Sequence, residues 1–314
     1  MSMPALFEGR LSAPVIASPL FIISQVDLVL AQCRAGVVGS FPSLNARPSG
    51  VLEQWLMRLK SELTDKDAPF AVNLIVHRSN PRLEEDLALC VKYQVPIVIT
   101  SLGARTDVND AIHSYGGIVL HDVIDNVFAR KAVEKGADGL VAVAAGAGGH
   151  AGTLSPFALV QEIRSWFDGP LALSGAISTG SAIAAAQAMG ADFAYIGSAF
   201  IATQEAVAQP GYKQMIVDSS SKDIVYSNLF TGVHGNYLRP SIEAAGLDPD
   251  ALPTSDPSKM DFGAFSEGKK AWRDIWGCGQ GIGGVDQVLP TADLVARLVR
   301  EYRATLSRMC AAAS

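Results

Sequence analysis

Eight short apolar runs recur along the first 200 residues, and this recurrence restricts the fold more than any other feature of the chain. Each run is rich in Val, Ile and Ala without strict alternation of apolar and polar residues, as is typical of parallel strands buried on both faces. Most of them end in small or polar residues. The runs cover residues 13–19, 36–42, 70–76, 95–101, 117–123, 139–145, 171–177 and 193–200.

Helix-like segments with apolar residues at three- and four-residue spacing separate several of these runs. Alternation of strands and helices predicts right-handed crossovers between parallel strands. Eight such units that close on themselves predict an α/β fold of the (β/α)8 TIM-barrel type, with an open doubly wound sheet as the rival. The predicted helices cover residues 48–64, 81–93, 123–135, 156–167 and 181–189.

The alternation of strand-like and helix-like segments stops after the eighth run. Residues 203–289 contain scattered prolines and a glycine-rich stretch at 277–284, and we interpret them as an excursion that covers the barrel mouth. Residues 291–308 are amphipathic and predict the closing helix. The whole chain, 1–314, is therefore expected to be one domain with an insertion on the substrate side.

Composition excludes several classes of function. The net charge of −6 argues against a nucleic-acid partner, because phosphate binding needs clustered Lys and Arg. No window of about 18 uncharged apolar residues exists, so we expect no membrane span. No secretory leader is visible, and the four cysteines are far apart in sequence, which predicts thiols in a reducing cytoplasm and no metal site.

The segment 146–152, GAGGHAG, follows the sixth run. Its small residues would let a flat ring system pack against the backbone, with His150 standing beside that ring. A histidine with an ordinary pKa near 6.5 can act as base, acid or hydrogen-bond donor, so His150 is the candidate catalytic residue. The alternative is a structural histidine in a polar loop. A dinucleotide fingerprint is disfavoured, because the next predicted helix begins only near Pro156.

Small residues also follow the seventh and eighth runs, where TIM barrels often bind phosphate. Backbone N–H groups there could approach an anion, although the glycines could equally serve tight turns. These candidates are Ser174, Gly175, Ala176, Gly197 and Ser198.

Polar residues interrupt two other runs. Asn73 lies inside an apolar strand, and its amide could contact the edge of the flat ring or bond to a neighbouring strand. His121 and Asp122 end the fifth run and are expected to line the barrel mouth. Asp138 is expected at the opposite end of the barrel, and His77 is expected to lie on the surface.

The excursion gathers polar and aromatic groups between residues 226 and 240. His234, Tyr237 and Arg239 could select the substrate, with Arg239 pairing an anion. They could equally hold the loop down or line an oligomer contact, and both interpretations stay open. Gln280, between two glycines, offers another amide that could return to the site.

Together these segments resemble the nitronate monooxygenase family, also called the 2-nitropropane dioxygenase family, whose members are FMN enzymes on a TIM barrel. The resemblance extends over nearly the whole chain and is carried by residues 72–74, 148–152, 174–177, 197–198 and 279–281. It implies that His150 acts beside the flavin N5. It also implies that the substrate, an alkyl nitronate, passes electrons to FMN and that reduced flavin then reacts with O2.

Carried over to this chain, the resemblance implies that the FMN phosphate binds at residues 174–176 and 197–198. The remaining cofactor-binding residues are expected to be Ser18, Pro19, Leu20, Asn73, Asp122, Gly148, Gly149 and Gln280.

Three positions depart from the usual pattern of that family. Leu20 replaces a methionine, Val143 a polar residue and Gly146 a glutamate, so the pocket is expected to be more apolar. The segment 234–239 is similar to relatives that act on coenzyme A thioesters. One alternative is therefore an NAD(P)H-dependent FMN reductase or dehydrogenase of an enoyl or acyl-CoA thioester or a quinone. A non-catalytic barrel that binds a phosphate ligand, a flavin-free lyase or isomerase, and a homodimeric state also stay open.

Overall fold

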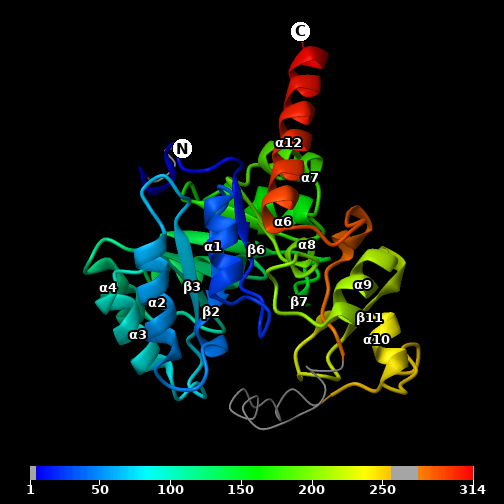
Figure 1. The fold of residues 1–314 in the computed structure, drawn as a ribbon, viewed down its shortest axis with the longest axis horizontal. Helices are drawn as coiled ribbons and strands as arrows, with labels where there is room; N and C mark the ends of the chain where they lie inside the picture. Colours follow the sequence, from blue (N-terminus) through cyan, green and yellow to red (C-terminus); the bar gives the residue numbers. More distant parts are fainter. Residues whose placement is uncertain (1–4, 256–274, 314) are drawn as a thin grey trace.

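Eight parallel strands form one sheet in the computed structural model, which describes residues 5–255 and 275–313 (Figure 1). Each of the eight apolar runs contains one of these strands, so that prediction is confirmed. Their order in the sheet is β1-β9-β8-β6-β5-β4-β3-β2. The strands are β1 (Val15–Ala17), β2 (Gly39–Pro42), β3 (Phe70–Ile75), β4 (Ile97–Ser101), β5 (Ile118–Val123), β6 (Gly139–Val143), β8 (Leu171–Ser174) and β9 (Phe193–Ile196).

The two outermost strands of this order meet and close the barrel. Ile16 bridges Val38 in parallel register, and the Ala17 N–H donates to the Val38 carbonyl at 2.8 Å. Inward-facing side chains of successive strands, among them Phe193 and Leu120, form a separate buried cluster that fills the interior. The fold is a TIM barrel, and the rival open sheet is excluded.

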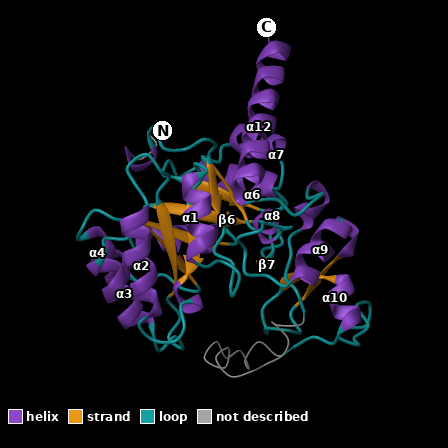
Figure 2. Cartoon of the chain, viewed as in Figure 1, coloured by secondary structure: helices purple, strands orange, loops and turns teal. Residues whose placement is uncertain are grey.

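Helices surround the barrel (Figure 2). All five predicted helices and the closing helix are present. Helices α1 and α4 were not predicted, because α1 is buried around much of its circumference and α4 has only eight residues, which hides the amphipathic period. The ring consists of α1 (Val26–Arg34), α2 (Val51–Glu62), α3 (Leu83–Lys92), α4 (Thr106–His113), α5 (Asn126–Glu134), α6 (Pro156–Arg164), α7 (Gly180–Met189) and α12 (Thr291–Ala313).

The excursion builds a second, three-stranded antiparallel sheet beside the barrel, in the order β10-β11-β7. Strand β7 (Gly149–His150) belongs to the segment that we expected to be a loop after the sixth strand; it pairs with Gly235 and Asn236 of β11. Helix α8 (Ser198–Ile201) follows β9 directly, and the other elements of the excursion are α9 (Pro210–Asp218), β10 (Ile224–Ser227), β11 (Gly235–Leu238) and α10 (Arg239–Ala244). Short 3-10 helices cover Ala5–Phe7, Ser43–Asn45, Ser221–Asp223 and Gln280–Gly284.

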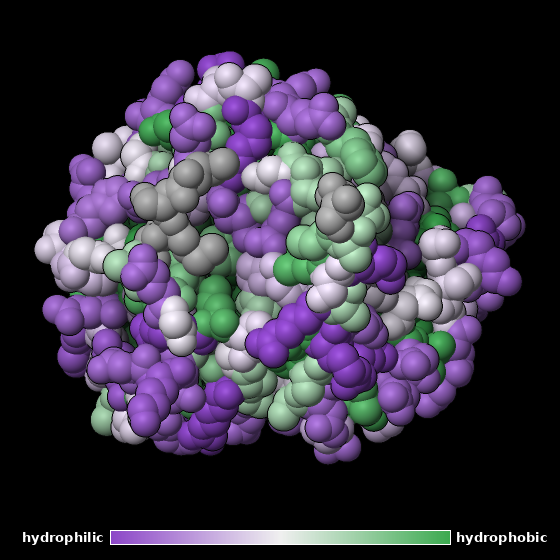
Figure 3. Space-filling view, turned by 90° about the horizontal axis from the view of Figure 1, so that it is seen from above, coloured by the Kyte–Doolittle hydropathy of each residue, from purple (hydrophilic) through white to green (hydrophobic). Residues whose placement is uncertain are grey.

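Within the described ranges, no helix is both long and apolar enough to cross a membrane. On the face shown in Figure 3, hydrophilic residues are interspersed with smaller apolar areas. The last turns of α12 project away from the barrel (Figure 1).

Candidate active site

A cavity of about 760 Å³ opens at the C-terminal ends of the barrel strands. Its volume is within the usual range for cofactor and ligand sites. Residues at or just beyond the ends of strands β3, β4, β5, β6, β8 and β9 line it, as expected for this fold. The predicted site residues in its lining are Ser18, Pro19, Leu20, Asn73, Asp122, Gly148, Gly149, His150, Ser174, Gly175, Ala176, Gly197 and Ser198.

One wall of the cavity consists of two backbone segments in close contact. A Cβ added to Gly148 would lie 2.9 Å from the Gly279 nitrogen, and one added to Gly279 would lie 2.7 Å from the Gly146 carbonyl oxygen. The Gln280 N–H donates to that same carbonyl at 2.9 Å. These approaches leave no room for side chains, which explains the glycines in both segments. Gln280 does return to the 146–148 segment, but its side chain lies against Gly146 and not in the cavity lining.

His150 is placed by the pairing of β7 with β11, and its half-buried side chain faces the cavity. The Thr231 hydroxyl donates to the Val233 carbonyl at 2.9 Å and lies 3.1 Å from Nε2 of His150. When the one hydroxyl proton is donated to Val233, Thr231 accepts from Nε2–H, and Nδ1 is then the acceptor nitrogen of the neutral ring. Burial lowers the pKa of His150 to about 4, so the imidazole is neutral near pH 7.

A chain of three polar side chains crosses strands β3, β4 and β5. The Asn73 amide donates to the Ile99 carbonyl at 3.0 Å and to the Ser101 hydroxyl at 2.7 Å. Ser101 in turn donates to Oδ2 of Asp122 at 2.7 Å. Both N–H groups of Asn73 are thus used within the protein, as in the structural alternative, and only its carbonyl oxygen remains for a ligand.

Asp122 is the last of these three hydrogen-bonded side chains, and its carboxyl is poorly solvated. Burial raises the pKa of its carboxyl to about 6, against the opposing effect of the Ser101 hydrogen bond. Tyr195 of β9 also lines the cavity, and burial together with the Asp122 charge raises the pKa of its phenol well above the ordinary value. His121, beside Asp122, bonds Thr100 through Nδ1 at 2.6 Å, and burial lowers its pKa to about 4.

The two candidate phosphate loops differ in what they offer. The Ala176 N–H was predicted to approach an anion. It donates instead to the Gly146 carbonyl at 3.2 Å, so this N–H is already used within the protein. Gly197 and Ser198 lie at the start of α8, and the Ser198 hydroxyl accepts from the Gly279 N–H at 2.9 Å. Ser198 therefore joins the loop after β9 to the wall formed by Gly146, Gly148 and Gly279, which we call the glycine wall.

Backbone strain is concentrated around the cavity. Three non-glycine residues in its lining have left-handed φ angles: Ile22 at 69°, Leu102 at 63° and Ala176 at 54°. Such conformations cost about 1–3 kcal/mol each and persist where the surrounding structure enforces them. At Ile22 the enforcement is visible, because Asn45 accepts from the Ile22 N–H at 2.7 Å and donates to the Leu20 and Ser24 carbonyls.

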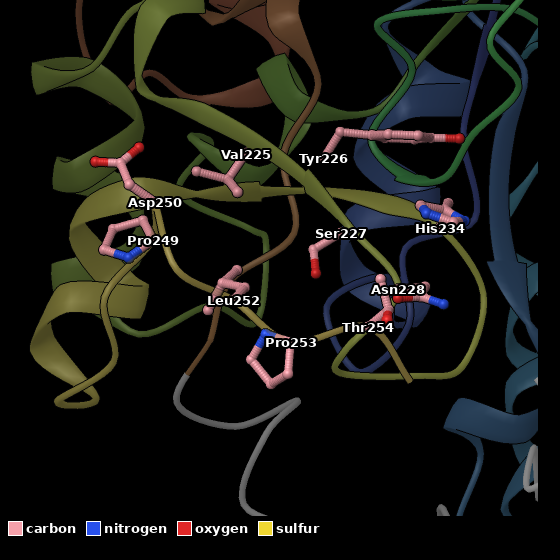
Figure 4. A pocket seen from close by; sticks show the side chains of 10 residues that line it. All are labelled: Val225, Tyr226, Ser227, Asn228, His234, Pro249, Asp250, Leu252, Pro253 and Thr254. Carbon is pink, nitrogen blue, oxygen red and sulfur yellow. The ribbon is translucent and has the colours of Figure 1, made fainter. Parts of the chain in front are cut away.

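The three candidate substrate residues of the excursion lie outside the large cavity. His234 stacks on Tyr226 with ring centroids 5.0 Å apart, and it lines a separate pocket of about 180 Å³ whose other end carries Asp250 (Figure 4). Arg239 pairs with both oxygens of Asp250, at 2.9 and 2.8 Å, so the anion it binds belongs to the protein. Tyr237 is buried against Phe230. This arrangement matches the interpretation in which these residues hold the loop down.

Several residues in or beside the cavity were not predicted. Ser101 ends the fourth strand, and the rule that selected Asp122 would have selected it too. His77 was expected on the surface, but it lines the cavity and bonds Ser79. No local sequence pattern marks Thr231, which reaches His150 only through the fold. Asp138 lies where expected, accepting from the Val119 N–H at 2.7 Å at the far end of the strands.

Comparison with known proteins agrees with this geometry. The family model described as nitronate monooxygenase matches residues 82–301. A nitronate monooxygenase from Paraburkholderia phytofirmans is 26% identical over 94% of both chains. The FabK structure from Thermotoga maritima superposes with a TM-score of 0.83 at 25% identity, covering 98% of this chain and 97% of the other.

A further relative bears a different name. The (3aS,4S,5R,7aS)-5-hydroxy-7a-methyl-1-oxo-octahydro-1H-indene-4-carboxyl-CoA dehydrogenase from Rhodococcus jostii is 25% identical over 73% of this chain and 63% of its own length. Because the family model matches well over half of the sequence, the chain belongs to the nitronate monooxygenase family of flavin-dependent oxidoreductases.

Proposed function

We propose that this protein binds FMN in the 760 Å³ cavity and oxidises alkyl nitronates, with O2 as the final electron acceptor. One observation supports this most strongly: a neutral histidine, His150, stands on the cavity wall beside a strip of backbone, at Gly148 and Gly279, that has no room for side chains. Such a strip allows a flat ring to lie directly against the peptide groups.

The cavity offers suitable groups for each part of FMN. Gly175, Gly197 and Ser198 would hold the phosphate, and the loop at Ser18 would border the ring. The Asn73 carbonyl oxygen can accept from a ring N–H. The two N–H groups of the same amide already donate within the protein and so do not take part. Bound FMN would supply the capacity to take an electron pair from the substrate and pass it to an acceptor.

His150 would handle the proton of the substrate. With Nε2–H donated to Thr231, Nδ1 would take the α-proton of a neutral nitroalkane and so form its nitronate, or accept a hydrogen bond from a donor group of the substrate. A neutral imidazole with a pKa of about 4 is a weak base, so the positioning of the substrate would have to supply much of the effect.

A second candidate is an NAD(P)H-dependent FMN reductase or dehydrogenase that acts on an enoyl or acyl-CoA thioester or a quinone. The apolar lining favours it, since Leu20 and Val143 face the cavity with other apolar residues such as Phe21 and Phe128. The Rhodococcus jostii relative carries the name of a CoA thioester dehydrogenase. NAD(P)H would then be the electron donor.

Anaerobic mixing separates these candidates. The FMN-loaded protein is mixed without oxygen with propyl nitronate, NADH or NADPH, and the flavin absorbance is followed. Bleaching by nitronate alone supports the nitronate activity. Bleaching by a nicotinamide supports the reductase, and a protein that binds no flavin supports a non-catalytic phosphate-binding barrel.

A further inference from the structure

The cavity carries one acidic group in a largely apolar lining. Among the described residues that line it, Asp122 is the acidic one, at the C-terminal end of β5. Its oxygen Oδ2 accepts from the Ser101 hydroxyl at 2.7 Å, and Ser101 accepts from the Asn73 amide at 2.7 Å. The hydrogen bond leaves Oδ1 as the oxygen that can take up a proton.

We propose that Asp122 is the proton store of this site: its carboxylate takes up one proton at Oδ1 when bound FMN gains an electron pair, and releases it when the pair leaves. This inference rests on the proposed binding of FMN in the cavity. The pair comes from the reduced substrate, or from a reduced dye in the test below. One proton from solvent goes to the flavin and a second to Asp122, so the net charge of the site is unchanged.

Electrostatics provides the reason. FMN that has gained two electrons and one proton carries one more negative charge than before. If that charge lay about 6 Å from Asp122, at an effective dielectric constant of about 20, it would raise the proton affinity of the carboxylate about a hundredfold. A carboxyl whose pKa already lies at about 6 would then be protonated throughout the neutral range.

The groups around Asp122 do not offset this effect. Ser101 approaches from β4 and Tyr195 from β9, and both are neutral at pH 7. Burial lowers the pKa values of His121 and His150 to about 4, so neither carries charge there. Lys131 of α5 also lines the cavity, but it is not among the groups that shift the pKa of Asp122. Burial raises this pKa, and the hydrogen bonds from Ser101 and from the backbone N–H of Asp122 lower it.

The test is the pH dependence of the midpoint potential of the bound flavin. FMN-loaded wild type and Asp122→Asn are titrated with a reduced dye between about pH 6.5 and 7.5, below the raised pKa that Asp122 would have beside reduced FMN. Each proton taken up with an electron pair contributes about 30 mV per pH unit. We expect about 60 mV per pH unit for the wild type and about 30 for Asp122→Asn. The control Asp168→Asn, an exposed carboxyl before β8, should keep the wild-type slope.

Equal slopes in wild type and Asp122→Asn would overturn the inference, because the second proton would then reside on the flavin or elsewhere. The wild type alone offers an independent check, since its reduced-minus-oxidised infrared spectrum should gain a band from a protonated carboxyl. If Asp122→Asn does not fold, the lack of that band in wild type overturns the proposal. A protein that cannot be loaded with FMN overturns the proposed function as well, whereas loaded protein with equal slopes overturns this inference only.

Discussion

His150 and Thr231 are 81 residues apart in the chain, yet the Thr231 hydroxyl lies 3.1 Å from Nε2 of the histidine. The pairing of β7 with β11 brings them together, because Gly235 of β11 lies opposite His150. Thr231 also interacts with Tyr237, where its side chain offsets part of the rise in the tyrosine pKa that burial causes. The excursion thus orients the histidine of the barrel.

Replacement of His150 by Ala should lower turnover by about 10²- to 10⁴-fold while FMN stays bound, since the side chain handles a proton and the adjacent backbone borders the ring. The measurement is steady-state turnover beside the flavin absorbance of the purified variant. His113→Ala is the matched control, because that histidine pairs with Asp138 at the opposite end of the barrel. Unchanged turnover in His150→Ala would remove this residue from the mechanism.

Thr231→Val should keep the shape of the loop but leave Nε2–H of His150 without its acceptor. We expect turnover to fall about ten- to a hundredfold because the ring is no longer held in one orientation and tautomer. Thr231→Ser retains the hydroxyl and should restore most of the activity. A pH–rate profile of all three proteins tests whether the histidine is affected. Equal rates for the Val and Ser variants would show that the hydrogen bond has no role.

His121 and His150, whose pKa values are lowered in the fold, should make the protein sensitive to acid. Their pKa values fall from 6.5 to about 4 in the fold, so the unfolded chain binds more protons between these values, and stability is lost as pH falls from about 6.5 to 4. Each histidine contributes up to about 3 kcal/mol to this loss in the free energy of unfolding. Denaturant unfolding of wild type and His121→Asn at pH 7 and 4.5 should show a smaller loss in the variant. A loss of equal size in both proteins would contradict the assignment.

Asp122 should change the pH dependence of stability in the direction opposite to the two histidines. Its pKa rises from 3.8 to about 6 on folding, so the native state binds more protons in that window, and stability is lost as pH rises through it. Asp122→Asn should therefore exceed the wild type in free energy of unfolding by up to about 3 kcal/mol at pH 7.5, and by much less near pH 4. Thermal denaturation at the two pH values measures this difference, and a difference independent of pH would refute the prediction.

Gly279→Ala should disrupt the glycine wall, because the new Cβ would lie 2.7 Å from the Gly146 carbonyl oxygen and 2.9 Å from the Gly148 nitrogen. We expect a loss of about 1–3 kcal/mol in stability and weaker FMN binding. Gly283→Ala is the matched control in the same segment, since nothing lies within 4 Å of its added Cβ. Both are compared by denaturant unfolding and FMN titration, and equal behaviour would show that the close contact is unimportant.

The barrel could be predicted from the sequence because its strands are buried on both faces and therefore appear as separate apolar runs. The end of each run then located the mouth, and Asp122 and the small-residue loops after the seventh and eighth runs do line the cavity there. Local patterns failed where tertiary contacts decide. The pairing that makes Gly149 and His150 a strand depends on β11, which lies more than 80 residues later.

The roles of individual polar residues were harder to predict. Arg239 looked like an anion-binding residue, but Asp250, 11 residues away, takes both of its hydrogen bonds. Asn73 looked like a flavin ligand through its whole amide, yet neighbouring strands use its N–H groups. In each case the sequence shows a polar group with hydrogen-bonding capacity, and only the fold shows which partner satisfies it.

The most direct test of the central claim is the visible absorption spectrum of the protein after incubation with FMN and removal of unbound flavin by gel filtration. The cavity, the glycine wall and His150 together predict about one FMN per chain, with the two visible-region bands of oxidised flavin, released on denaturation. A colourless protein from which all FMN separates would contradict the claim that this barrel is a flavin enzyme.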